Sequence, residues 1–347
     1  MMNVLGILRG FPGLGRVVSG TAILETLRDE YNCNIEIISY LQGQNFLEKR
    51  GHVKECDVTP LDYCSIGLLP TNKMGAYIHQ RIKKFHPDIV IIDGEPFILH
   101  SLRISYPNLK IVSLLNPSDV DNPQNDVEAM DFFTSMYSLS NLAIVHGLRG
   151  VETDKYKSII SINTILRKEI LNIKNVPTPN IYCVLGGGTV NVGAQFAEST
   201  IQMAKLCVEA ASYLKDYTMH IICSSDNIYK KLSSGVPTNV QLHKEIIDSE
   251  EYYSKACLVI TRSGRNTLSE LAYLGIPAIS FVSGCSYRKA EQEQNLKSLN
   301  ATNICSAEID ISAKDFADLC IKQQSYRQEC PKFIIGNLTA VSEILSL

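Results

Sequence analysis

Short apolar runs alternate along the chain with longer segments in which apolar residues recur every three or four positions. In the first half this alternation predicts a strand at Val4–Leu8, a helix near Val17–Glu30 and a strand at Asn34–Tyr40, which form one βαβ unit. Three further runs are apolar at successive positions, as in parallel strands covered by helices: Asp88–Asp93, Leu109–Leu115 and Leu142–Val145. The first half therefore predicts a doubly wound sheet.

The alternation restarts after a proline-containing stretch. Pro177 and Pro179 disfavour helix and predict a stiff, extended connection, so we place the domain boundary there. We expect a first domain over residues 1–172, a linker over 173–180, a second domain over 181–330, and a final helical segment over 331–347 that can pack on either domain, including back on the first. The strands expected in the second domain are Ile181–Leu185, Met219–Cys223, Val240–Leu242, Leu258–Thr261 and Ala278–Val282.

This pattern predicts an α/β protein with two doubly wound, Rossmann-like parallel-sheet domains. Open α/β sheets bind ligands at the carboxyl ends of their strands. We therefore expect the functional site in a central cleft that both sheets face.

Composition and charge narrow the function. The chain has 347 residues, 33 Lys and Arg against 36 Asp and Glu, and a formal net charge of −3, so we expect no nucleic-acid partner. The 11 cysteines form neither a CxxC pair nor a Cys/His cluster at metal spacing, which predicts buried thiols in a reducing compartment and no metal site. No apolar run reaches about 18 residues, and Arg9, Gly10 and Pro12 interrupt any secretory leader, so we expect a cytoplasmic protein.

A glycine-rich loop opens the second domain. Gly186, Gly187 and Gly188 follow the predicted strand directly and precede a long helical pattern. Bare glycines let a backbone approach a phosphate, although glycines equally suit a tight strand-to-helix turn. Neither GxGxxG nor GxxxxGK[ST] is present, which disfavours a standard dinucleotide site or an ATP-hydrolysing loop.

A second motif, Thr261–Glu270, predicts a strand end, a Ser-Gly turn and a helix. Ser263 or Thr267 is placed to cap the helix. The exposed N–H groups at the start of the helix, together with the Arg265 guanidinium, are suited to neutralise a diphosphate without metal. Glu270 lies one to two turns into the helix, where its carboxylate can accept both hydroxyls of a ribose. The alternative is that Thr267 and Glu270 form only a capping box, since T-x-x-E is that pattern.

A third motif, Glu291–Asn295, is a polar cluster 21 residues after Glu270. Alone, such a cluster is typical of a solvated helix face. In this order, however, the glycine loop, the Ser-Gly helix, the Gly-x-Pro at residues 275–277 and the polar cluster resemble the nucleotide-sugar half of GT-B glycosyltransferases, especially the MurG-like N-acetylglucosaminyltransferase group. The resemblance covers about Ile181–Leu299 well and the first half more loosely.

The resemblance implies the GT-B fold and inverting, metal-independent transfer of a sugar from a nucleotide diphosphate donor. UDP is the expected nucleotide, the UDP-sugar is a substrate, and no cofactor is expected. By the same resemblance, Gly187, Gly188, Ser263, Gly264 and Arg265 hold the diphosphate, Glu270 holds the ribose, Glu291 and Gln292 contact the donor sugar, and the backbone near Ile246 holds the base.

The first half matches the family's pattern only in part. Gly13 and Gly15 lie between the first strand and helix, as in the relatives, but Arg16 stands where those proteins often have histidine. Arginine stays protonated and cannot act as a base at neutral pH. We expect Arg16 to bind an anionic acceptor or the leaving diphosphate instead.

The Pro87–Pro96 stretch resembles a Pro-Asp-x-Val-x-x-Asp-x-Glu-Pro segment of some relatives. It places Asp93 and Glu95 at a strand's carboxyl end, where either carboxylate can take the proton of an acceptor hydroxyl. Alternatively, Asp93 caps the next turn or helix. The weaker candidates are Asp119, Asp121 and His146.

Two other functions use the same scaffold. A nucleotide-sugar hydrolase or 2-epimerase would share the donor half, and Arg16 at the histidine position also suits a catalytically silent subunit that binds sugar nucleotides. We expect an acceptor besides the nucleotide-sugar donor, and peripheral contact with a membrane is compatible with the sequence.

Overall fold

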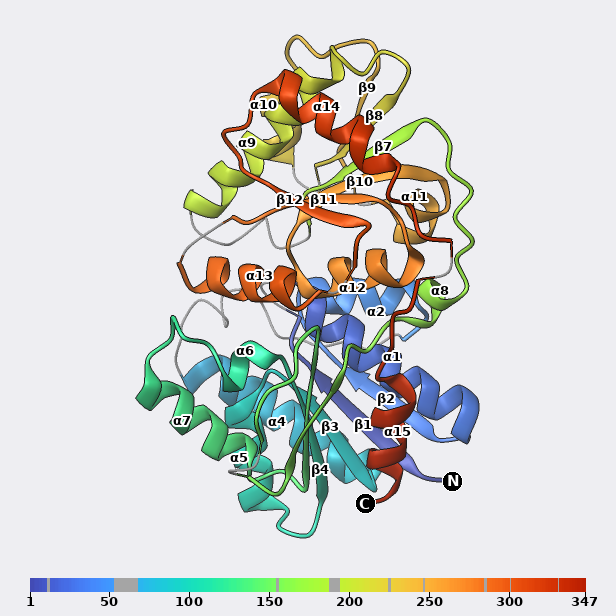
Figure 1. Ribbon diagram of the computed structural model, residues 1–347. Coiled ribbons are helices and arrows are strands. Elements are labelled where there is room, and N and C mark those ends of the chain that lie inside the picture. Colours follow the sequence, from blue (N-terminus) through green and yellow to red (C-terminus); the bar gives the residue numbers. More distant parts are fainter. Residues whose placement is uncertain are drawn as a thin grey trace. The chain divides into compact units, whose positions relative to one another are not determined.

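The computed structural model describes residues 1–10, 13–52, 68–153, 156–186, 194–223, 226–245, 247–283, 286–299, 301–329 and 331–347. The chain divides into two compact units, each of which contains a six-stranded parallel sheet (Figure 1). Unit 1 comprises Met1–Lys168 and Ile335–Leu347, and unit 2 comprises Glu169–Ile334.

The sheet of unit 1 has the strand order β2-β1-β3-β4-β5-β6. Its strands are β1 (Asn3–Leu8), β2 (Asn34–Ile38), β3 (Ile89–Asp93), β4 (Lys110–Leu115), β5 (Leu142–Gly147) and β6 (Ile159–Asn163). The helices that belong to this unit are α1 (Gly15–Tyr31), α2 (Gln42–Lys49), α4 (Leu68–Phe85), α5 (Pro96–Ser105), α6 (Pro117–Val120), α7 (Val127–Tyr137) and α15 (Asn337–Leu345).

Alternating side chains of the strands of unit 1 enter two different apolar cores. In β3, Ile89 and Ile91 pack with α1 and α15, whereas Val90 and Ile92 pack with α4 and α5. Because both faces of the strand are covered, every residue of β3 is buried. This explains the continuous apolar runs in the sequence.

The sheet of unit 2 has the strand order β12-β11-β10-β7-β8-β9. Its strands are β7 (Asn180–Val184), β8 (Thr218–Ile222), β9 (Val240–His243), β10 (Ala256–Arg262), β11 (Ala278–Phe281) and β12 (Ile304–Ala307). Its helices are α9 (Ala194–Ala211), α10 (Asp226–Leu232), α11 (Ser249–Lys255), α12 (Arg265–Leu274), α13 (Ser286–Ser298) and α14 (Ala313–Gln324), and the short α8 (Lys168–Leu171) lies at the division between the units.

Two of the four edge strands, β6 and β12, were not predicted. Both are short and only partly buried, so their sequences lack the continuous apolar run of the central strands. The expectation of five strands in the second half is therefore wrong, because its sheet has six.

The segments that join the units are tied to them locally. The backbone N–H groups of Val176 and Thr178 donate to the carbonyls of Ser254 and Lys255, so this extended stretch runs along unit 2. Helix α15 buries Ala340, Val341 and Ile344 in the same apolar core as α1, and Figure 1 shows it in red beside that helix. The C-terminal helix is thus part of unit 1.

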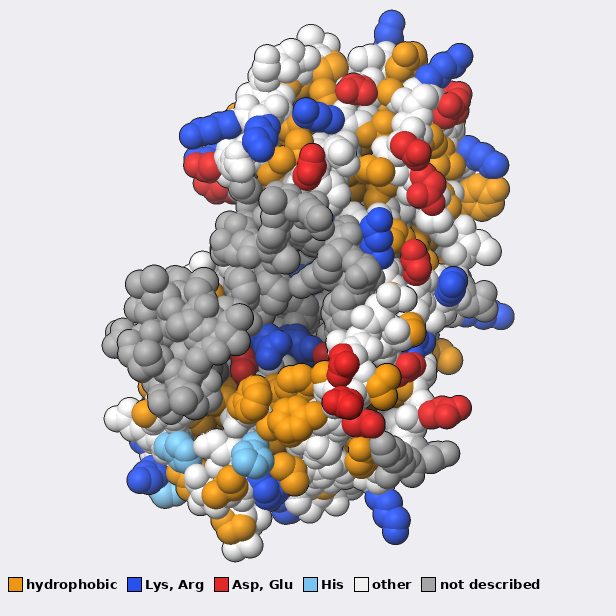
Figure 2. Space-filling view, turned by 90° about the vertical axis from the view of Figure 1, so that its left-hand side faces the viewer, with side chains coloured by type: hydrophobic (Ala, Val, Ile, Leu, Met, Phe, Trp, Pro, Cys, Tyr) orange, Lys and Arg blue, Asp and Glu red, His pale blue; other side chains and the backbone are white. Residues whose placement is uncertain are grey.

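Two surface properties bear on partners. No helix in the described part of the chain is long and apolar enough to cross a membrane. Helices α5 and α7 nevertheless expose the large apolar side chains of Phe97, Ile104, Val127 and Phe132. Figure 2 shows hydrophobic side chains gathered on one face of unit 1.

Candidate functional site

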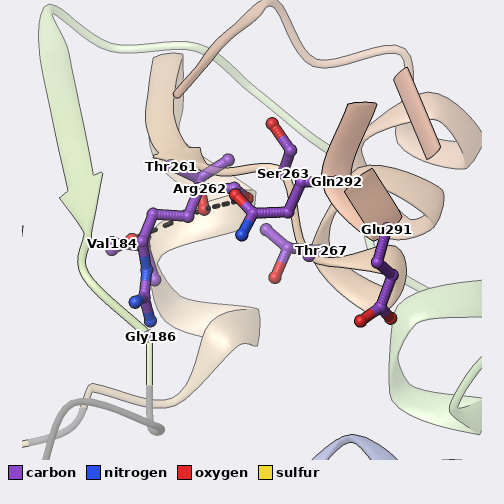
Figure 3. Close-up of a pocket in the computed structure, with 9 residues that line it drawn as sticks. Val184, Gly186, Thr261, Arg262, Ser263, Thr267, Glu291 and Gln292 are labelled. Atoms are coloured by element: carbon purple, nitrogen blue, oxygen red, sulfur yellow. Dashed lines mark hydrogen bonds between the residues drawn. The ribbon is translucent and has the colours of Figure 1, made fainter. Parts of the chain in front are cut away.

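A pocket of about 180 Å³ lies in unit 2 at the carboxyl ends of the adjacent strands β7 and β10 (Figure 3). The chain leaves β7 toward β8 on one side and leaves β10 toward β11 on the other, so the pocket lies where the strand order reverses. It is lined by Val184, Gly186, Thr261, Arg262, Ser263, Gly264, Thr267, Glu291 and Gln292.

Gly186 and Arg262 form one side of this pocket. Gly186 has a φ of +82°, and a Cβ added to it would lie 2.7 Å from Nη2 of Arg262. The left-handed backbone favours glycine here, and a larger residue would also displace the end of the Arg262 side chain. Figure 3 shows the Arg262 side chain reaching along the strand ends to Gly186, which places a permanent positive charge beside the loop.

The pocket also contains the beginning of helix α12. The N-cap is Gly264, in an extended conformation and without a side-chain cap, and the helix begins at Arg265. The expectation that Ser263 or Thr267 caps this helix is wrong, because Ser263 Oγ bonds to Ser280 Oγ at 2.7 Å and Thr267 lies within the first turn. For the same reason Thr267 and Glu270 do not form a capping box.

An uncapped helix start offers backbone N–H groups and a partial positive charge to an anion. Here the first turn of α12 carries no acidic residue that would oppose such binding. The helix start and Arg262 therefore give this part of the pocket a positive potential.

Arg265 is placed differently from the expectation. Its side chain is buried, its Nε donates to Asn266 Oδ1 at 3.2 Å, and it is not part of the pocket lining. The arginine at the pocket is Arg262, the last residue of β10. A diphosphate role for Arg265 stays a prediction, and the structure favours Arg262 for that role.

Glu270 is buried in the second turn of α12. Its Oε2 accepts a hydrogen bond from the hydroxyl of Tyr253 at 3.0 Å. Tyr253 lies in α11, whose packing therefore helps to fix the carboxylate. Ribose binding by Glu270 stays a prediction.

The two residues predicted to contact the donor sugar differ in their surroundings. Both Glu291 and Gln292 line the pocket, and Figure 3 shows the Glu291 carboxylate on the side away from Arg262. The Gln292 carboxamide, however, accepts from the Ser283 N–H at 3.0 Å and donates to the Ser283 carbonyl at 2.7 Å. Gln292 thus fixes the backbone after β11.

Gly187, Gly188 and Ile246 lie outside the described residues. Their predicted contacts with the diphosphate and the base therefore stay predictions.

In unit 1, Arg16 is held by two carboxylates. Its Nη1 lies 2.7 Å from Asp93 Oδ1, and its Nη2 lies 2.7 Å from Asp119 Oδ1. Burial opposes the charge on Arg16, but the attraction of Asp119 and Asp93 outweighs it and raises the arginine pKa well above its usual value. The guanidinium therefore ties α1 to the end of β3 and to helix α6, which does not favour the expected binding of an anionic acceptor or diphosphate.

Asp93 and Glu95 point to different partners. Gly94 between them has a φ of +81°, and a Cβ there would lie 2.5 Å from Cδ of Arg16. Asp93 is fully buried against Arg16 and does not cap α5, whose N-cap is Glu95. Glu95 is partly exposed and accepts hydrogen bonds from the Tyr40 hydroxyl and Arg9.

The remaining predicted residues of unit 1 have other surroundings. Gly15 begins α1, and a Cβ added to Gly13 would meet nothing within 4 Å among the described atoms. Asp121 pairs with Arg149, and His146 is fully buried within β5.

Sequence reasoning missed Arg262, Arg9 and Tyr40 as site residues. Each lies at or just after the end of a strand, which is the one signal that was available. Nothing in the sequence shows which of these strand-end side chains meet, because they come from separate segments.

Comparison with known proteins adds a match to a family model in unit 2. Residues 185–317 match the glycosyltransferase family 28 C-terminal domain, which includes all pocket residues except Val184. The UDP-N-acetylglucosamine–N-acetylmuramyl-(pentapeptide) pyrophosphoryl-undecaprenol N-acetylglucosamine transferase of Thermosipho africanus is 27% identical over 202 residues, which cover 58% of this chain and 53% of that protein. The chain thus spans about half the length of the curated relatives it matches.

Solved structures share the fold of the whole chain. MurG of Acinetobacter baumannii aligns with a TM-score of 0.60 at 14% identity and covers all of both chains. A putative UDP-N-acetylglucosamine 2-epimerase from Listeria monocytogenes aligns with a TM-score of 0.65 at 11% identity and covers 99% of this chain and 96% of that chain. The chain is MurG-like and has the GT-B fold. The resemblance inferred from the motifs and the predicted fold class are confirmed.

Proposed function

We propose that the chain is a glycosyltransferase that moves a sugar from a UDP-sugar to an acceptor hydroxyl or amine with inversion at the anomeric carbon. The observation that carries this proposal is the pocket formed by Gly186, Arg262 and the start of α12 within the family 28 domain. These groups are the ones that a nucleotide diphosphate needs: close backbone approach, a fixed cation and helix N–H groups.

In this proposal the leaving diphosphate is stabilised by protein groups alone. Negative charge grows on the diphosphate as its bond to the sugar breaks, and fixed dipoles together with Arg262 lower the energy of that state. We propose that Gly187, Gly188, Ser263 and Gly264 supply the backbone contacts, and that neither a metal nor a cofactor takes part.

The other donor contacts follow from the same assignment. Glu270 accepts the ribose hydroxyls, the backbone near Ile246 holds the base, and Glu291 contacts the sugar. Gln292 acts indirectly, by fixing Ser283. The Thermosipho relative is named for transfer of N-acetylglucosamine from its UDP donor, so UDP-N-acetylglucosamine is the first donor to test.

On the acceptor side we propose Glu95 as the base in preference to Asp93. Asp93 is fully buried and bonded to Arg16, whereas the Glu95 side chain is 18% exposed. A base must reach the proton that it removes, so exposure decides between the two carboxylates.

We further propose a reducing, cytoplasmic location with peripheral membrane contact and without nucleic-acid partners. Six of the seven described free cysteines are buried, and burial raises the pKa of the Cys257 thiol to about 11, which keeps it protonated. The exposed apolar side chains of α5 and α7 supply the surface for membrane contact.

The test is to follow UDP-N-acetylglucosamine, UDP-glucose and UDP-galactose by NMR, with and without a panel of alcohol and amine acceptors. The proposal predicts UDP release that depends on acceptor, and a product with inverted anomeric configuration. Fast UDP release without acceptor would instead indicate a hydrolase, and a change of configuration at C2 would indicate an epimerase. UDP binding without turnover would indicate a silent binding subunit.

A further inference from the structure

Two donors converge on one oxygen of Glu95. The Tyr40 hydroxyl donates to Oε1 at 2.5 Å, and Arg9 Nε donates to the same oxygen at 3.4 Å. No described residue bonds to Oε2 of this carboxylate. Among the described contacts, the two oxygens therefore differ: Oε1 is anchored by two donors and Oε2 by none.

The anchor comes from three neighbouring strand ends. Arg9 follows β1, Tyr40 follows β2 and Glu95 follows β3, and these strands are adjacent in the order β2-β1-β3. Tyr40 is 2% exposed, so its ring is packed and its hydroxyl is fixed beneath the carboxylate. The Glu95 and Arg9 side chains are more open, at 18% and 29% exposure.

The hydrogen bond from Tyr40 satisfies a buried hydroxyl and also restricts the orientation of the Glu95 carboxylate. Glutamate has several rotatable bonds, and a carboxylate that acts as a base must hold one oxygen toward its substrate. Packing of the Tyr40 ring fixes the donor, and the short hydrogen bond then fixes the rotamer of the acceptor. Asp93 has no such open side, because it is buried against Arg16.

We propose that Tyr40 is a positioning residue that orients Glu95, so that Oε2 removes the proton from the acceptor hydroxyl. This inference rests on the proposed function. In the step, the acceptor proton passes to Oε2 and the acceptor oxygen bonds to the anomeric carbon. The bond from that carbon to the diphosphate oxygen breaks, and its electron pair leaves with UDP.

The experiment is a double-mutant cycle of Tyr40→Phe and Glu95→Gln. It measures kcat for transfer from UDP-N-acetylglucosamine to the same acceptor panel, with water alone as the reference. Tyr40→Phe keeps the ring and removes the hydroxyl, and we expect it to lower kcat by about 10- to 100-fold with KM for the donor unchanged. Glu95→Gln should lower kcat by about 10²- to 10⁴-fold. Adding Tyr40→Phe to Glu95→Gln should cost nothing more, because the hydroxyl acts only through the carboxylate.

The matched control is Tyr106→Phe, which removes another hydrogen-bonded phenol of unit 1, the partner of His79 at 3.0 Å. This variant should keep the wild-type kcat. If Tyr40→Phe does not fold, Arg9→Gln provides a second variant at a more exposed position. It should lower kcat by less than Tyr40→Phe, and this loss of kcat should also vanish in the Glu95→Gln background.

Wild-type kcat in Tyr40→Phe, or an equal loss of kcat in both backgrounds, would overturn the inference. Binding of UDP to the wild type distinguishes this failure from that of the proposed function. A wild type that binds no UDP, or releases none from any donor, refutes the proposed function and this inference with it.

Discussion

At the scale of one residue, Glu270 has two roles that can be tested separately: it accepts a hydrogen bond from the buried Tyr253, and we propose that it binds the ribose. Its carboxylate accepts the Tyr253 hydroxyl, and an amide at this position can accept the same bond. If Glu270 also holds the ribose, Glu270→Gln and Glu270→Ala should both weaken UDP binding by about tenfold or more, since a hydrogen bond to a charged group contributes about 1.5–3 kcal/mol.

Calorimetry of UDP binding together with urea unfolding measures both roles. Glu270→Gln should largely keep the wild-type stability, and Glu270→Ala should lose it because Tyr253 is left without this partner. Unchanged UDP affinity in a destabilised Glu270→Ala variant would show that the residue is only structural.

Asp93 and Glu95 should separate stability from turnover. Asp93→Asn removes a charge from a buried pair with Arg16, and breaking such a pair costs about 3–5 kcal/mol, reduced here because Asp119 still pairs with the arginine. Glu95→Gln changes a partly exposed side chain and should cost less than about 1 kcal/mol. Urea unfolding measures the free energy of unfolding of both variants. An Asp93→Asn variant that is as stable as the wild type but inactive would indicate that Asp93 is the catalytic base.

At the scale of elements, strands β7, β8 and β9 are joined by a stack of rings. Tyr182 stacks on His220, which stacks on His243, and the two imidazoles share a hydrogen bond of 3.0 Å. Burial, followed by the charges of His243 and Lys255, lowers the pKa of His220 to about 4. Burial also lowers the pKa of His243, against the opposing effect of Glu251.

This stack predicts a loss of stability in acid. The folded state keeps His220 neutral, so its contribution is complete above the ordinary pKa of 6.5 and is lost as the pH falls from 6.5 toward 4. Because the ring is only half-buried, we expect a loss of about 1–2 kcal/mol. His220→Phe keeps the stacking and removes the titration, so its unfolding free energy should fall less between pH 6.5 and 4.5, and a parallel fall in both proteins would contradict the assignment.

The elements also show what the sequence could predict. Central strands such as β3 and β10 are covered on both faces, so their apolar runs were recognisable. Of the four half-exposed edge strands, β2 and β9 were predicted, whereas β6 and β12 were missed. Helix α12 was predicted, but its cap was assigned to the wrong residue because Gly264, without a side chain, fills that position. The local apolar pattern thus predicted helices and strands better than the residues at which they begin and end.

At the scale of the whole molecule, the order of motifs predicted the fold and the resemblance to MurG-like proteins. A glycine loop, a Ser-Gly helix and a polar cluster in sequence indicated the MurG-like GT-B chain that the comparisons confirm. The same order did not show that Arg262 rather than Arg265 lines the pocket, or that Tyr40 meets Glu95. Such contacts depend on which strand ends become neighbours in a sheet.

Above all, we propose that the pocket of unit 2 binds the diphosphate of a sugar nucleotide through Arg262. Isothermal titration of UDP into the wild type, Arg262→Gln and the control Arg265→Gln tests this most directly. We predict that UDP binds the wild type, that Arg262→Gln weakens binding by about 10- to 100-fold, and that Arg265→Gln has a smaller effect. No binding of UDP to the wild type at millimolar concentration, or equal affinity in wild type and Arg262→Gln, would show that Arg262 does not bind the diphosphate of a sugar nucleotide in this pocket.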